Sequence, residues 1–421
     1  MPTELVCDYQ SPRWTGEVAD CSFPVTLDTY SRCSFGCLYC FSSFQKTLHR
    51  GGAERTTYEQ ALRSVNVERV KKLFSGETVN QFTPWTSQKR PIQWGGLSDP
   101  FDMWEKKYGK TLELMEFFDS IDYPISFSTK SAWVFHDERY LRLFKKQGRN
   151  WHIKFSIITL DEKKAARIER GVPSPADRLE AMRIASGCGC ATTLRLRPYI
   201  IGVSEDGLEE LIARAAQAGA YSVSTECLCM ELRAVCNKSN SQVRDAFQKI
   251  SEQAGFDVIR YYREHSRGGG YLRLTPAEKA PIFERIHRLC DRHGLAFFCS
   301  DACGKAQSAS CCCCGAPPSF AYSKGNFSQA LQIARRNGVV RFQDISGEMS
   351  HLQNVGYASA NGFNTGSSQN RAKFLDFSLK DYLRFLWNNP QRGQSPGKMF
   401  SDYLEAAGLD ENGDVIYRRK E

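Results

Sequence analysis

The chain has 421 residues, of which 41% are hydrophobic and 12% aromatic, and its formal net charge is +9. This length suits one large domain with an appendage. No stretch approaches the roughly 20 consecutive apolar residues that span a bilayer, and the N-terminus lacks the features of a signal peptide. We therefore expect a cytoplasmic protein with no membrane association. The positive charge is compatible with an anionic partner such as nucleic acid.

The predicted elements alternate between strands and helices along the first half of the chain. Strand-like runs occupy 23–30, 91–96, 124–130, 151–158, 192–201 and 221–228. Helical patterns lie near 56–74, 107–120, 136–147, 174–186 and 206–218. Six β-α repeats predict an α/β fold with a parallel sheet, which we interpret as a partial (β/α)6 TIM-type barrel. Polar residues gather at the C-terminal ends of these strands, where such folds place their active sites.

The pattern loosens after residue 230. We expect a helix at 240–254, a basic glycine-rich loop at 263–273, a buried strand at 293–301, helices at 327–337 and 379–389, and a polar loop at 358–371. The chain then divides into an N-terminal extension (1–21), a barrel core (22–235), a cysteine-rich extension (236–318) and a mixed, mainly helical C-terminal region (319–421).

Cysteine is frequent, with 17 residues in dense groups separated by long gaps. No cysteine lies between Cys40 and Cys188, whereas four are consecutive at 311–314. Cytoplasmic thiols seldom form a disulfide framework, and clustered ones more often bind metal or carry out redox chemistry. The grouping therefore predicts local cysteine sites.

The densest early group is "SRCSFGCLYCFSSF", residues 31–44, in which Cys33, Cys37 and Cys40 have the spacing C-x3-C-x2-C. Three thiolates can hold three irons of a [4Fe–4S] cluster and leave the fourth iron free for a small molecule. The alternative is a zinc site, but zinc usually takes four protein ligands, often in C-x2-C pairs. The spacing favours the iron–sulfur cluster.

This motif after a first strand resembles the signature of the radical S-adenosylmethionine superfamily. Further segments are similar to its spore photoproduct lyase-like group, at 95–101, 128–131, 154–185 and 194–220. The resemblance covers roughly residues 22–230. It implies that S-adenosylmethionine chelates the open iron and is reductively cleaved to a 5′-deoxyadenosyl radical that abstracts hydrogen. It also implies a reductant such as flavodoxin or ferredoxin as a partner.

The resemblance implies cofactor contacts at particular positions. Lys130 and Ser156 match residues that hold S-adenosylmethionine, and the backbone at Tyr39 would contact its adenine. Four residues would lie along its methionine and ribose: Gly95, Gly96, Ser98 and Asp99. Arg197 could meet a carboxylate. The plainer alternatives are a solvated strand end for Lys130, a buried hydroxyl for Ser156, an ordinary turn for the glycines and a pair with a helix acid for Arg197.

The sequence departs from the lyase in one respect that matters for its chemistry. The hydrogen-donating cysteine of the lyase has no counterpart between Cys40 and the third strand, and Phe41 stands where the lyase has a tyrosine. If a thiol donor exists, Cys227 and Cys229 at the end of the sixth strand are candidates for a catalytic role. The alternative is that both are small buried hydrophobic residues.

A second dense group follows the strand at 293–301. Cys299, Cys303 and two of Cys311–Cys314, for which we take Cys311 and Cys314, could ligate an auxiliary iron–sulfur cluster. Zinc, or no metal, is the alternative.

Two classes of function remain open. The first is radical repair or modification of a nucleic acid such as DNA, or of a nucleobase, favoured by the resemblance and the positive charge; a duplex base would have to be extruded. The second is modification of a peptide or small metabolite with the help of an auxiliary cluster, favoured by the second cysteine group and the missing donor.

Overall fold

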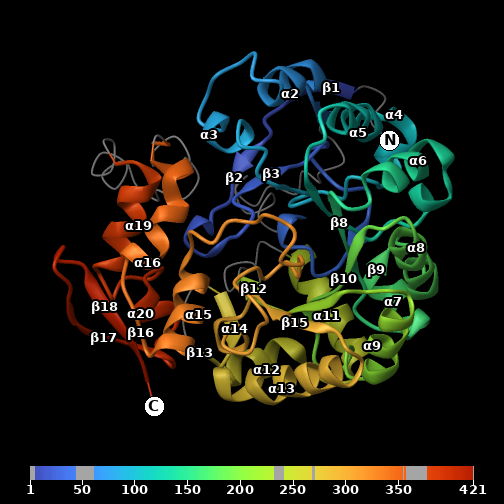
Figure 1. Cartoon of the computed structure of the whole chain (residues 1–421). Helices are drawn as coiled ribbons and strands as arrows, with labels where there is room; N and C mark the ends of the chain where they lie inside the picture. The colour runs from blue at the N-terminus through green and yellow to red at the C-terminus, as the bar shows by residue number, and fades with distance from the viewer. Residues whose placement is uncertain are drawn as a thin grey trace.

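The computed structural model describes residues 5–43, 61–231, 241–267, 271–353, 355–356 and 377–420. Its centre is an eight-stranded sheet in the order β15-β11-β10-β8-β7-β6-β3-β2 (Figure 1). The strands are β2 (Arg13–Trp14), β3 (Val25–Leu27), β6 (Ile92–Trp94), β7 (Ile125–Thr129), β8 (Trp151–Ser156), β10 (Ala191–Tyr199), β11 (Ser222–Cys227) and β15 (Ala296–Cys299). The strands from β3 to β15 are mutually parallel, and β2 is antiparallel to β3.

The six predicted strands are all present, in chain order and parallel, as β3, β6, β7, β8, β10 and β11. The sheet is larger than the six-stranded core because it is extended at both edges. The predicted strand near 293–301 is β15, which adds to β11 as a seventh parallel strand, and β2 covers the edge of β3.

Helices cover the apolar face of the sheet. They are α5 (Lys110–Ser120), α6 (Glu138–Gln147), α8 (Pro175–Gly187), α9 (Leu208–Gln217) and α13 (Pro276–Arg292). The start of α8 is fixed by a capping box in which Ser174 and Asp177 each bind the other's backbone N–H, with proline at the first helical position.

The helix predicted at 56–74 is shorter than expected and is preceded by a strand. Of the described residues in this range, only Val67–Phe74 are helical, as α2. The helix begins there because the Asn66 side chain caps it by accepting from the Arg69 N–H. Residues Leu62–Val65 instead form β5, parallel to β1 (Leu5–Tyr9), and residues 56–60 lie outside the described residues.

The two faces of the sheet differ in polarity because side chains alternate along each strand. On β8, Trp151 and Phe155 belong to the main hydrophobic core, and the Trp151 ring packs edge-on against Phe144 of α6, with 5.8 Å between ring centroids. The intervening His152 lies on the other face and bonds Ser126 Oγ at 2.9 Å and Thr193 Oγ1 at 2.7 Å. The face opposite the helices is therefore polar.

Residues 311–315, which we name the cysteine plug, lie across this polar face. The carbonyl of Gly315 accepts from Thr193 Oγ1 at 3.2 Å and from Ser222 Oγ at 2.8 Å. The carbonyl of Cys313 accepts from Ser224 Oγ at 2.7 Å. Serine and threonine on adjacent strands therefore hold the plug in place.

The C-terminal region forms a unit beside the sheet (Figure 1). The predicted helices are α15 (Phe327–Asn337) and α19 (Leu379–Trp387). The region also holds an antiparallel sheet that the sequence did not indicate, formed by β16 (Val339–Val340), β18 (Val415–Arg419) and β17 (Leu404–Leu409). The loop predicted at 358–371 lies outside the described residues.

Two further predicted elements follow the core. The helix expected at 240–254 is α11 (Ser241–Ala254). Part of the basic loop predicted at 263–273 instead belongs to β13 (Ser266–Arg267) and β14 (Tyr271–Leu274), and residues 268–270 lie outside the described residues. Within the described residues, no helix is both long and apolar enough to cross a membrane.

Candidate functional site

The three cysteines of the opening motif lie on the loop that follows β3. Cys37 lies in a short strand, β4 (Gly36–Cys37), which pairs with β9 (Glu169–Arg170), and the backbone of Leu38 donates to Ile168 O at 2.9 Å. The next turn is closed by the Cys40 N–H, which donates to Cys37 O at 3.2 Å. The loop is therefore anchored to the segment after β8.

The thiols of this loop are half-buried neighbours. Burial raises the pKa of Cys33 and Cys37, the latter to about 12, and Cys37 interacts electrostatically with both Cys33 and Cys40. Across the described residues, no three His, Cys, Asp or Glu side chains surround a point suited to a single metal ion. A [4Fe–4S] cluster requires a different arrangement. Each thiolate binds a different iron, so the three thiols need not surround a single point.

Lys130, directly after β7, lies beside this loop. Its ammonium is 5.7 Å from the centre of the Tyr39 ring, and the Tyr39 hydroxyl donates to the Glu169 carboxylate. Burial opposes the charge on Lys130, but Cys37 and Glu169 outweigh it and raise the pKa of the ammonium. Lys130 is therefore part of a charged group near the thiols and not a solvated strand end.

Glu169 is held by a buried ion pair that the sequence did not reveal. Arg178 Nη1 lies 2.7 Å from Glu169 Oε2, both side chains are 1% exposed, and Arg178 also donates to Ser156 O at 2.6 Å. The pair joins the cysteine loop to the end of β8. In the sequence, the only sign of this pair is that both residues are charged and lie in the segment 154–185, which resembles the lyase-like group.

Asp99 fixes the end of β7. Its carboxylate accepts from Thr129 Oγ1 at 2.9 Å and from the backbone N–H groups of Phe101 and Lys130 at 3.0 and 2.6 Å. These bonds hold the backbone of Lys130 in position. The carboxylate of Asp99 is thus engaged within the protein.

The turn after β6 is tightly packed. Gly95 has a φ of +93°, and a Cβ there would lie 2.6 Å from the carbonyl oxygen of Ser128, so no other residue fits without movement. Gly96 continues the turn, and Ser98 donates its hydroxyl to Tyr30 O at 2.8 Å. Packing against β7 accounts for this turn, and contact of its residues with a cofactor stays a prediction.

Ser156, at the end of β8, stands opposite Arg195 of β10, whose Nη1 lies 3.5 Å from Ser156 Oγ. Arg197, farther along β10, forms an ion pair with Glu226 of β11, with Nε 3.0 Å from Oε2. Burial favours the neutral acid, but Arg197 outweighs it and the pKa of Glu226 is about 2. The acid that pairs with Arg197 is therefore on a strand and not on a helix.

Lys154 is the functional candidate that sequence reasoning missed. It lies on the same polar face of β8 as Ser156, is 1% exposed, and its Nζ has no hydrogen-bond partner within the described structure. The sequence could have indicated it, because Lys154 lies in the predicted strand "WHIKFSII". Side chains alternate along a strand, so Lys154 shares a face with His152 and Ser156.

The two candidate thiol donors differ in position. Cys227 belongs to the main hydrophobic core, on the face opposite its neighbour Glu226, and its N–H donates to Asp301 Oδ2 at 3.0 Å. Cys229 is half-buried; burial, with Glu226 next, raises its pKa to about 11. Cys227 therefore packs away from the polar face, whereas Cys229 has Glu226 as its strongest electrostatic neighbour.

The structure divides the six cysteines proposed for an auxiliary cluster into two sets. Cys299 and Cys303 pack in the main core, and each lies electrostatically close to Asp301. Cys311 and Cys314 pack around Phe23 in a separate hydrophobic cluster. The four ligands that we selected from the sequence are therefore not brought together.

Known proteins that are similar to this chain share little sequence with it. No family model matches the chain. Uncharacterized proteins of Mycobacterium tuberculosis and Mycobacterium bovis are 22% identical over 280 residues, which is 65% of this chain and 76% of theirs.

Among solved structures, a mutant of spore photoproduct lyase matches with a TM-score of 0.50 and 16% identity, over 70% of this chain and 80% of the lyase. A second lyase mutant, with dinucleoside spore photoproduct, matches with a TM-score of 0.50 and 17% identity over the same shares. These matches show the fold that the resemblance predicted. The chain has the fold of spore photoproduct lyase, a radical S-adenosylmethionine enzyme.

Proposed function

We propose that this protein is a radical S-adenosylmethionine enzyme in which Cys33, Cys37 and Cys40 hold a [4Fe–4S] cluster. The observation that carries the proposal is the convergence of three half-buried thiols with Lys130 beside the C-terminal end of the parallel sheet. When bound, the cluster and S-adenosylmethionine would supply a reductively generated 5′-deoxyadenosyl radical for hydrogen abstraction.

The residues of the cysteine loop and its surroundings fit a [4Fe–4S] cluster that binds S-adenosylmethionine. The loop offers three neighbouring thiols and no fourth cysteine, as a cluster with one open iron requires. Thiolates must form when metal binds, and the raised pKa of Cys37 means that assembly releases a proton there. Lys130 lies on the thiol side of the site, where a cation can bind the cofactor carboxylate.

The chain's own residues would position the cofactor. Asp99 holds the Lys130 backbone, and the Glu169–Arg178 pair connects Tyr39 to β8. We propose that Lys130 and Ser156 bind S-adenosylmethionine and that Gly95 permits close approach of the backbone next to it. Reduction requires an electron donor such as flavodoxin or ferredoxin.

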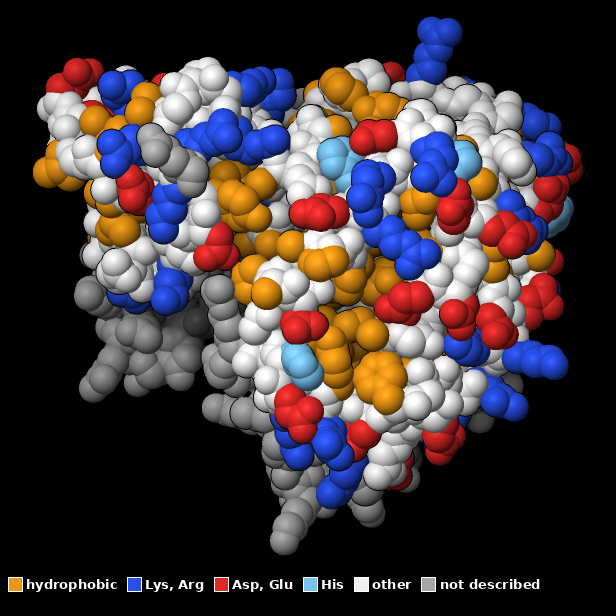
Figure 2. Space-filling model, turned by 90° about the horizontal axis from the view of Figure 1, so that it is seen from below, with side chains coloured by type: hydrophobic (Ala, Val, Ile, Leu, Met, Phe, Trp, Pro, Cys, Tyr) orange, Lys and Arg blue, Asp and Glu red, His pale blue; other side chains and the backbone are white. Residues whose placement is uncertain are grey.

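We favour a nucleic acid or nucleobase as the substrate. The lyase mutant with dinucleoside spore photoproduct shares this fold, and the net charge of +9 suits an anionic partner. On the face seen in Figure 2, basic side chains are interspersed with acidic ones, so this face does not offer a continuous basic track for a duplex.

Modification of a peptide or small metabolite is the second candidate. It is favoured by the position of Cys227, whose side chain packs in the main core away from the polar face. A reaction of the lyase type needs a hydrogen-donating thiol, and the packing of Cys227 leaves Cys229 as the remaining candidate of the two.

The test is cofactor cleavage. Anaerobically reconstituted protein with dithionite should convert S-adenosylmethionine to 5′-deoxyadenosine, measured by chromatography. The triple variant Cys33→Ala, Cys37→Ala, Cys40→Ala should lose this activity and its iron. The double variant Cys188→Ala, Cys190→Ala removes thiols outside the site and should retain both. Equal cleavage by the triple variant would refute the proposal.

A further inference from the structure

We propose that Lys154 and Arg195 form an oxyanion subsite on the polar face of the sheet, which binds a carboxylate or phosphate group of the substrate. This inference rests on the proposed function, because the substrate meant here is that of the proposed radical S-adenosylmethionine enzyme. The subsite itself is defined by this chain's residues alone.

Lys154 lies where burial makes a charged ammonium energetically unfavourable. Its side chain is 1% exposed, and its Nζ makes no hydrogen bond with any described residue. The only aromatic contact of the ammonium within the described structure is with Phe23, at 5.7 Å from the ring centre. A buried charge without a partner destabilises a fold, and among the described residues Lys154 Nζ has no hydrogen-bond partner for its charge.

The surrounding charges do not supply that partner. Burial lowers the pKa of Lys154; Cys314 and Cys312 oppose this shift, whereas Arg195 and Arg197 add to it. The carboxylate of Glu226, on β11, is already paired with Arg197. Among the described residues, the Arg195 guanidinium makes one side-chain hydrogen bond, a long one of 3.5 Å to Ser156 Oγ. The face therefore carries more positive than negative charge.

The cysteine plug, which covers this face, offers thiols and not carboxylates. Cys314 and Cys312 are the plug residues that influence Lys154 electrostatically, and Cys314 Sγ lies 3.5 Å from Gln93 Oε1. The plug carbonyls at Cys313 and Gly315 accept from strand hydroxyls. The plug thus closes one side of the subsite without neutralising it.

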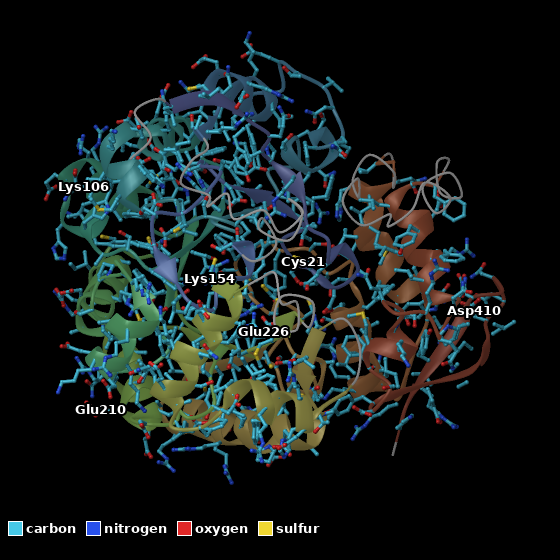
Figure 3. The ribbon with its side chains drawn as sticks, turned by 180° about the vertical axis from the view of Figure 1, so that it is seen from behind. Cys21, Lys106, Lys154, Glu210, Glu226 and Asp410 are labelled. Carbon is cyan, nitrogen blue, oxygen red and sulfur yellow. The ribbon has the colours of Figure 1, made fainter. Side chains whose placement is uncertain are left out.

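Lys154 is separate from the residues proposed to bind the cofactor, whereas Arg195 adjoins one of them, Ser156. Lys130 interacts with Tyr39 and Cys37 at the cysteine loop, whereas Lys154 precedes Ser156 by two positions and lies deeper along β8. Figure 3 shows Lys154 and Glu226 near the middle of the molecule. The Arg197 and Glu226 side chains are 15% and 35% exposed, so water reaches this face. A substrate bound between cofactor and plug could place an anionic group at Lys154.

The experiment measures anion binding by calorimetry on the reconstituted full chain, with inorganic phosphate and with acetate as separate probes. Wild-type protein should bind at least one of them, and the preferred probe identifies a phosphate or a carboxylate substrate group. Lys154→Met should weaken that binding at least about tenfold, the effect typical of a lost charge-assisted bond. Lys106→Met, at the periphery in Figure 3, is the control and should bind as wild type.

Thermal unfolding adds a readout that separates binding from folding. Because Lys154 Nζ makes no hydrogen bond in the part of the chain that the structure describes, Lys154→Met should melt at or above the wild-type temperature while it loses anion binding. The subsite is refuted if wild type binds neither probe, or if Lys154→Met binds equally well. It is also refuted if saturating S-adenosylmethionine displaces the anion, because the residues then serve the cofactor. Retained anion binding without cofactor cleavage would instead refute only the proposed function.

Discussion

Arg178 and Glu169 form a buried ion pair, with Nη1 2.7 Å from Oε2 and both side chains 1% exposed. Glu169 also accepts from Tyr39, and Arg178 donates to Ser156 O, so the pair joins the cysteine loop to the end of β8. The cysteine loop is thus held by an electrostatic contact with residues more than 120 positions away in the chain.

Removing one partner should leave an uncompensated charge. We expect Glu169→Gln to lower the free energy of unfolding by about 3–5 kcal/mol, because Arg178 remains buried and charged. Glu180→Gln, which breaks the Glu180–Arg183 pair with side chains 45% and 62% exposed, should cost less than about 1 kcal/mol. Urea denaturation measures both. Equal effects of the two changes would show that burial does not strengthen the Glu169 pair.

The order of the core elements was predictable because it depends on local signals. The runs that became β7, β8, β10 and β11 are rich in β-branched and aromatic residues, and caps such as Ser174 fix helix starts. The short strands β1, β2 and β5 were not predicted, since two to five residues carry too little periodicity. Their existence depends on pairing partners that only the fold brings close.

The site was predictable in part for the same reason. The spacing of Cys33, Cys37 and Cys40 is local, so it could be found, and Lys130 followed from the resemblance. The separation of Cys299 from Cys311 was not predictable, because it depends on which face of the sheet each segment covers. The alternation of β11 did contain one usable signal: if Glu226 faces the site, Cys227 faces away.

Lys130 should act on the cofactor more than on the cluster. Lys130→Ala removes the cation beside Tyr39 and Cys37 and should weaken S-adenosylmethionine binding roughly ten- to a hundredfold, as expected for about 1.5–3 kcal/mol. Iron content, measured colorimetrically, should stay at the wild-type level. Lys146→Ala, an exposed pair partner of Asp119, serves as the control. Lower iron with unchanged affinity would make Lys130 a fold or cluster residue.

His351 should make stability depend on pH far from the cysteine loop. Its ring is 1% exposed against Trp85, with 4.6 Å between ring centroids, and burial lowers its pKa to about 3. The unfolded chain binds a proton below a pKa of about 6.5, whereas the folded protein does not until about 3. The stability from neutral His351 is therefore complete above about pH 6.5 and is lost as the pH falls towards 3.

We expect His351→Phe to reduce the fall in urea midpoint between pH 7 and pH 5, because the unfolded variant has one proton fewer to gain. Parallel profiles for wild type and His351→Phe would contradict the assignment of this dependence to His351.

The iron content will decide between one cluster and two. Cys299 and Cys303 pack in the main core, whereas Cys311 and Cys314 pack around Phe23 in another cluster of side chains. One auxiliary cube cannot bind both sets unless a segment moves. We therefore expect about four irons per chain after reconstitution, all dependent on Cys33, Cys37 and Cys40. The double variant Cys299→Ala, Cys303→Ala should keep them and still cleave the cofactor. About eight irons in the wild type, falling to about four in that variant, would show that the two sets do come together when metal is bound.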